Sequence, residues 1–115
     1  MNMEAPVPFP QKDQPTEQVV FDRQELSLIL RLYGQFVAAG EWRDYALSFG
    51  REAAVFAIFR RTAETPLYRI EKRPKLRAKQ GPYAVLGAEG QVLRRGHELE
   101  AVLKVLERKL IRPVE

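Results

Sequence analysis

Apolar residues between positions 22 and 40 recur with the period of an α-helix. Asp22 can cap a helix with its carboxylate, while Glu25, three residues later, can reach back to the N–H of the cap. Gly40 is suited to the left-handed conformation that ends many helices. The pattern predicts a first helix with one apolar stripe, at spacings of 3, 4, 7 and 11 residues: Leu26, Ile29, Leu30, Tyr33 and Val37.

From residue 42 the period of the apolar positions changes to two, which is typical of β-strands. The alternation predicts strands over 45–49 and 53–59, with Gly50 and Arg51 in the left-handed positions of a tight turn. The second of these strands is apolar on both faces, so we expect it to lie inside the sheet. Further strands are predicted at 67–72, 83–86 and 91–95.

A second helix is predicted over 97–110, where the apolar positions again follow the helical period and Pro113 limits continuation. The fold class is therefore α+β, with an N-terminal helix, an antiparallel sheet of about five strands and a C-terminal helix. Each helix has one apolar stripe, so we expect both on one face of the sheet. Residues 1–18 contain four prolines and are predicted to be a disordered tail, leaving 19–115 as a single domain.

Composition limits the classes of protein to consider. With no cysteine, disulfides and thiolate metal sites are excluded. The N-terminus lacks the features of a signal peptide and no segment has the length of a membrane helix, so we expect a cytoplasmic protein without a membrane partner. The net charge is +4, and residues 51–80 hold nine Lys and Arg against three Asp and Glu. This concentration suggests a polyanionic partner, either nucleic acid or an acidic protein.

The basic segment after Pro74 is the first candidate site. If it is extended, four cations at alternate positions point one way at intervals of about 6.6 Å, a spacing that suits a row of phosphates. Together with two cations of the preceding strand they form the predicted nucleic-acid site: Arg69, Lys72, Arg73, Lys75, Arg77 and Lys79. The alternative is a solvated basic loop.

Two smaller sites are predicted. Arginines beside the start of the second helix suggest an anion site, Arg94, Arg95, Gly96 and His97. The alternative is that Arg94 and Arg95 protect an edge strand. Trp42, Arg43 and Tyr45 suggest an interaction surface, because these residue types are enriched at binding hot spots. Any apolar face of the 53–59 strand that the helices leave uncovered, either Phe56 with Ile58 or Val55 with Phe59, would favour a homodimer.

Several segments of the chain carry a resemblance to a known family. They are Phe-Asp-Arg-Gln-Glu-Leu at 21–26, Ala-Gly-Glu-Trp-Arg-Asp-Tyr at 39–45, Phe-Arg-Arg at 59–61, Pro-Leu-Tyr-Arg-Ile-Glu-Lys-Arg-Pro at 66–74 and Arg-Gly-His at 95–97. Over about residues 19–110 the chain is similar to a bacterial family of short hypothetical proteins catalogued as domain of unknown function 2794. The resemblance implies a cytoplasmic single-domain protein, and it brings no assigned activity, cofactor or site residue.

An enzymatic function has little support in the sequence. His97 is the only histidine, no phosphate-binding or nucleophile motif occurs, and Glu98 and Glu100 lie two apart on a predicted helix, so they point in different directions. We therefore predict no catalytic residues, no metal and no cofactor. The best prediction is a basic protein that binds the nucleic-acid backbone or acts as a regulatory accessory, and the alternative is a protein-interaction or assembly module without nucleic acid.

Overall fold

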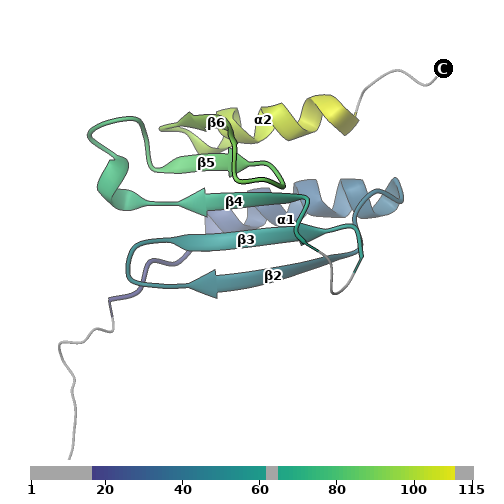
Figure 1. Ribbon diagram of the computed structural model, residues 1–115, viewed down its shortest axis with the longest axis horizontal. Coiled ribbons are helices and arrows are strands. Elements are labelled where there is room, and N and C mark those ends of the chain that lie inside the picture. Colours follow the sequence, from purple (N-terminus) through teal and green to yellow (C-terminus); the bar gives the residue numbers. More distant parts are fainter. Residues whose placement is uncertain (1–16, 62–64, 111–115) are drawn as a thin grey trace, which may run out of the picture.

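A computed structural model describes residues 17–61 and 65–110 and contains the predicted elements (Figure 1). The predicted tail before residue 17, residues 62–64 and Pro113 lie outside the described residues. Helix α1 spans Arg23–Ala38. The Asp22 carboxylate accepts a hydrogen bond from the Glu25 N–H, and the Glu25 carboxylate accepts one from the Asp22 N–H, each at 2.8 Å. Gly40 follows the helix with φ of 79°. Both predicted ends of the helix are confirmed.

The predicted apolar stripe of α1 is partly wrong. The buried positions of the helix are Glu25, Ile29, Leu32 and Phe36, whereas Leu30 and Val37 are 37% and 43% exposed. The helix has two overlapping apolar stripes about 100° apart, and the spacing rule alone does not say which one faces the core. The second stripe is left on the flank of α1.

Five antiparallel strands form one sheet in which neighbours in sequence are neighbours in space, in the order β2-β3-β4-β5-β6. The predicted strands are confirmed, with bounds that differ by at most one residue. As predicted, the strand with two apolar faces lies inside the sheet. The bounds are β2 Asp44–Phe49, β3 Ala54–Phe59, β4 Tyr68–Lys72, β5 Tyr83–Leu86 and β6 Val92–Gly96.

The turn between β2 and β3 differs from the prediction. The Gly50 N–H donates to the Ala53 carbonyl at 2.9 Å, so the strands remain paired as far as this bond. Gly50 is not among the glycines with positive φ. The left-handed position predicted for it is wrong, because Gly50 still belongs to the paired part of the hairpin.

Both helices pack on the same face of the sheet, as predicted; α2 spans Leu99–Leu110 and contacts α1, β5 and β6. In Figure 1 α1 lies behind the middle strands, and β2 lies below it at the edge. Phe56, Ile70 and Val85 stand opposite one another on three adjacent strands and are completely or almost completely buried beneath the helices. The core is completed from α2 by Leu99, Val102, Leu103 and Leu106.

The other face of the sheet is more polar. Phe56 and Ile58 are buried under the helices, so only Val55 and Phe59 of the two pairs predicted from β3 lie on this second face, and they are half-buried. Glu71 is 7% exposed there, beside Val55. A large uncovered apolar face on β3 is therefore absent from the described structure.

The segment after β4 is compact rather than extended. Pro74–Leu76 forms a 3₁₀ helix, and the chain turns back through a hydrogen bond from the Gly81 N–H to the Leu76 carbonyl at 2.9 Å. Gly81 has φ of 109°, and a Cβ there would lie 2.3 Å from the Gly96 carbonyl carbon. The predicted extended arm is wrong, because proline is well suited to a first helical turn and Leu76 gives the segment a half-buried anchor.

Candidate functional site

The six cations of the predicted nucleic-acid site are not collected into one row. Arg69 and Lys72 lie on opposite faces of β4, because side chains alternate along a strand. Lys72 faces the helices and is committed to the core, where Nζ lies 2.7 Å from Glu25 Oε1 and 2.9 Å from the Val20 carbonyl oxygen. Arg73 Nε donates to Glu71 Oε1 at 3.0 Å. The turns of the 73–82 segment separate the remaining three cations.

Lys75 is exposed and lies 3.2 Å from Glu52, which belongs to the β2–β3 loop. The side chains of Arg77 and Lys79 are also exposed. An exposed ion pair is worth at most about 1 kcal/mol and can open to a ligand. Three exposed cations on a turn therefore remain accessible, but they lack the regular spacing expected of an extended segment.

At the predicted anion site at the start of α2, two of the four residues form hydrogen bonds within the chain. Arg95 Nη1 donates to the Gly81 carbonyl oxygen at 3.4 Å, and His97 Nε2 lies 2.9 Å from the Arg77 carbonyl oxygen. The helix begins at Leu99 rather than at His97, and Glu98 and Glu100 flank its first residue. These carboxylates place negative charge where an anion would have to bind, so the geometry disfavours an anion here.

The predicted interaction surface at Trp42, Arg43 and Tyr45 is divided between core and surface. Trp42 is 3% exposed and stacks on Phe36, with ring centroids 4.0 Å apart and planes 7° apart. Arg43 is exposed and Tyr45 is 40% exposed. Trp42 was assigned wrongly, because a tryptophan next to a charged residue can still turn its ring into the core.

A cluster of hydrogen bonds around the buried carboxylate of Glu25 joins α1 to the sheet. Glu25, 8% exposed, accepts hydrogen bonds from the Asp22 N–H, the Lys72 ammonium and the Tyr83 hydroxyl. Burial, followed by the hydrogen bond to Glu25, raises the pKa of the Tyr83 hydroxyl above its usual range. Every polar atom of this cluster has a partner, so we interpret it as a structural link between α1, β4 and β5.

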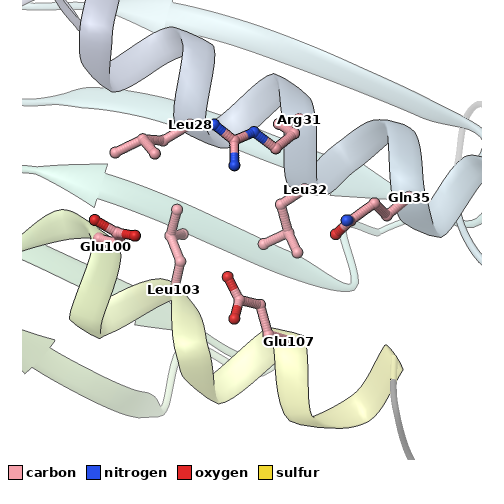
Figure 2. A pocket seen from close by; sticks show the side chains of 7 residues that line it. All are labelled: Leu28, Arg31, Leu32, Gln35, Glu100, Leu103 and Glu107. Atoms are coloured by element: carbon pink, nitrogen blue, oxygen red, sulfur yellow. The ribbon is translucent and has the colours of Figure 1, made fainter.

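The groove between the two helices has a volume of about 240 Å³, below the range of about 300–1,000 Å³ that is usual for ligand sites. Figure 2 shows leucine side chains from both helices in this groove and carboxylates from α2 at its edge. It lacks a convergent set of buried polar groups. Its lining residues are Leu28, Arg31, Leu32, Gln35, Glu100, Leu103 and Glu107. Among the described residues, no group of three or more His, Asp and Glu is placed to hold a metal ion.

The edge strand β2 carries the clearest unpartnered surface. Its side chains on the helix side are Tyr45, Leu47 and Phe49, which are 37% to 40% exposed although all three are large and apolar. They stay exposed because α1 covers the inner strands and β2 lies beyond its flank. Tyr45 contacts the flank of α1 through Tyr33, with ring centroids 5.0 Å apart. We call Tyr45, Leu47 and Phe49, together with Leu30 and Val37 of α1, the β2 face.

Residues 19–103 match the model of a protein family described as Protein of unknown function (DUF2794). The chain belongs to the DUF2794 family. The match covers α1, all five strands and the start of α2. Neither a curated protein nor a solved structure matches the chain. Both the 73–82 segment and the β2 face lie within the DUF2794 match, and none of the described helices has the length and apolarity needed to cross a membrane.

Sequence reasoning identified one residue of the β2 face in this DUF2794 domain, Tyr45, and missed the other four. Leu47 and Phe49 were assigned to a strand, and Leu30 and Val37 to the core side of α1. One signal was available in the sequence: β2 has no charged residue between positions 45 and 49, whereas the last strand contains Arg94 and Arg95. An edge strand usually carries such charges.

Proposed function

We propose that this chain is a cytoplasmic protein-interaction module without catalytic activity, and that the β2 face is its binding surface. The observation that carries this proposal is the row Tyr45, Leu47 and Phe49, whose large apolar side chains are 37% to 40% exposed on an edge strand. Sheet edges bind extended segments by adding a strand, with backbone hydrogen bonds for affinity and alternate side chains for specificity. The β2 face offers both components.

A second candidate function, nucleic-acid binding, is supported by the exposed cations Lys75, Arg77 and Lys79 and by the outer face of the sheet. Arg69, Arg73 and Arg95 all lie on the face opposite the helices. Arg69 and Arg73 are each two residues from Glu71 and therefore share its face. Arg95 stands opposite Ala84, which stands opposite Glu71. The carboxylate of Glu71 offsets part of this charge through its bond to Arg73. We place this function second because Lys72, one of the six predicted cations, is held in the core.

The experiment that tests the first proposal is site-specific photo-crosslinking in cells. A benzophenone amino acid replaces Leu47 in one variant and Val92 in a control variant. Val92 is 51% exposed on β6, the other edge strand. We expect a defined covalent adduct from position 47 and none from position 92. Absence of an adduct at position 47, or equal labelling at both positions, would refute the β2 face as a binding surface.

The same protein preparations test nucleic-acid binding. Phosphate contacts would make the purified protein carry material that absorbs at 260 nm and is released by salt. The triple variant Lys75→Gln, Arg77→Gln, Lys79→Gln would then weaken binding to all sequences alike. Under the interaction proposal the parent binds no oligonucleotide at about 50 mM salt. Binding that the triple variant weakens, without an adduct at position 47, would favour the second candidate.

A further inference from the structure

We propose that the partner of the β2 face is a second copy of this chain, and that two β2 strands pair antiparallel about a two-fold axis at Leu47. This inference rests on the proposed function, because it names the occupant of the same surface. The result would be a ten-stranded sheet with all four helices on one side. Four features of β2 support it: the direction of its outward backbone groups, its self-complementary register, the absence of charge from residues 45 to 49 and its apolar area.

The backbone groups of β2 that point away from β3 belong to the residues whose side chains form the apolar row. The Gly50 N–H donates to the Ala53 carbonyl, its direct partner in the hairpin. Hydrogen-bonded and non-bonded pairs alternate in an antiparallel ladder, so even-numbered residues of β2 point their backbone groups at β3 and odd-numbered residues point theirs outward. Consistent with this, the Tyr45 N–H donates to the Asp44 side chain at 2.8 Å rather than to β3.

Only some registers can use these outward groups. Pairing two copies at Leu47 places Leu47 opposite the partner's Leu47 and Tyr45 opposite the partner's Phe49. All three odd-numbered residues then meet odd-numbered residues, so the outward N–H and C=O groups bond to each other and the two apolar rows lie on the same face. Asp44, the one charged residue of β2, falls opposite the partner's Gly50, and no like charges meet.

The two edge strands, β2 and β6, differ in the features that prevent pairing with another chain. β6 carries Arg94 and Arg95 and has an irregularity in its pairing with β5 at Val85 and Leu86. Arginines and bulges both discourage pairing of an edge strand with another chain. β2 pairs regularly with β3 over all six of its residues and has neither device. The row that runs across the sheet through Phe56, Ile70 and Val85 ends at Leu47 on the β2 edge and at Arg94 on the β6 edge.

The exposed apolar area suits an interface of ordinary size. Five side chains of the β2 face are exposed by 37% to 43%, which at roughly 200 Å² for a large side chain gives about 400 Å² per protomer. Two protomers supply about 800 Å². At the usual apolar share of about 60%, this corresponds to an interface of about 1,300 Å², near the lower end of the range for stable complexes. The charges are also compatible, because β2 contributes no cation to an interface between two chains that are each positive overall.

The first test is sedimentation of the purified full chain at tens of micromolar. We expect a mass of twice 13.3 kDa for the parent. Leu47→Lys places two ammonium groups opposite each other at the axis, so we expect a monomer with unchanged circular dichroism. Val92→Lys introduces the same charge on the other edge and should remain a dimer. A monomeric parent, or a dimer that persists in Leu47→Lys, would overturn the proposal.

The second test determines the register of the two β2 strands. The chain has no cysteine, so any disulfide must form at the introduced position. Directly opposed residues of a hydrogen-bonded pair have Cα atoms about 5.5 Å apart, within the range for a disulfide. Leu47→Cys should therefore form an intersubunit disulfide under mild oxidation. In the same register two copies of Ser48→Cys are diagonal neighbours about 7–8 Å apart and should not. Oxidation of Ser48→Cys but not of Leu47→Cys would contradict the pairing.

The crosslinking experiment separates this inference from the function on which it rests. An adduct of the chain with itself supports both. An adduct with a different protein, together with a monomeric parent, retains the interaction function and refutes the second copy as partner. An internal adduct between position 47 and residues 1–16 of the same chain would also refute it. No adduct and a monomeric parent would refute both proposals.

Discussion

Lys72 Nζ lies 2.7 Å from Glu25 Oε1, and this ion pair joins the centre of the sheet to the first turn of α1. Both side chains are largely buried, at 14% and 11% exposure. The lysine was expected among the nucleic-acid contacts because it belongs to the most basic part of the sequence. Its position shows that some of that charge is structural: it neutralises a carboxylate that also caps a helix.

Glu25→Gln should destabilise the fold strongly. Glutamine keeps the shape and can still bond the Asp22 N–H, but it leaves the Lys72 ammonium without its counter-charge. We expect the free energy of unfolding to fall by about 3 kcal/mol in urea denaturation. The control is Glu52→Gln, which breaks the exposed pair with Lys75 and should cost less than about 1 kcal/mol. Equal costs for the two variants would contradict the structural role of the buried pair.

Tyr83 should make stability depend on alkaline pH. Its pKa is raised in the folded chain, so the neutral hydroxyl is favoured by folding. The contribution is therefore complete below the ordinary pKa of about 10 and is lost as the pH rises above it. Tyr83→Phe should cost about 2 kcal/mol at pH 8, and the difference from the parent should shrink towards about pH 11.

Denaturation midpoints at several pH values measure this effect. Tyr68→Phe removes another half-buried tyrosine hydroxyl and controls for the loss of a hydroxyl as such. If the parent and Tyr83→Phe lose stability in parallel between neutral and alkaline pH, the bond to Glu25 does not govern the titration.

Trp42 should behave as a core residue. Its ring is stacked on Phe36 and is 3% exposed, so Trp42→Ala should lower the free energy of unfolding by about 4 kcal/mol. The neighbouring Arg43→Ala, on an exposed side chain, should change it by no more than about 0.5 kcal/mol. Thermal unfolding followed by circular dichroism serves for both variants. A tolerated Trp42→Ala would restore Trp42 as a surface residue.

Two glycine-to-alanine substitutions should have opposite effects on the free energy of unfolding. Gly81→Ala puts a Cβ 2.3 Å from the Gly96 backbone at φ of 109°, so we expect a loss of about 3 kcal/mol. Gly34→Ala lies on an exposed part of α1 with no atom within 4 Å of the new Cβ. It should raise stability by about 1 kcal/mol, because alanine has the higher helix propensity. Loss of stability in both variants would contradict the open surroundings of Gly34.

The helices and strands and their order follow from local patterns in the sequence. The capping box at Asp22 and Glu25, the change of period at residue 42 and the stripe of α2 are local signals, and local hydrogen bonding and alternation decide such features. The family was also accessible from sequence, because short segments over most of the domain carry the resemblance.

Which side chains form a surface depends on contacts between distant parts of the folded chain. The conformation of 73–82 depends on Leu76 and on the fit of Gly81 against Gly96, contacts between parts of the chain that are distant in sequence. Lys72 does not join the other cations of the basic segment, because it pairs with the buried carboxylate of Glu25, 47 residues away in the sequence. Leu47 is exposed because α2 packs on β5 and β6 and α1 packs on the inner strands, which leaves β2 at the uncovered edge, and Leu30 is exposed because it lies on the flank of α1 rather than toward the core. Such outcomes depend on where whole elements pack, which a periodic pattern within one element does not contain.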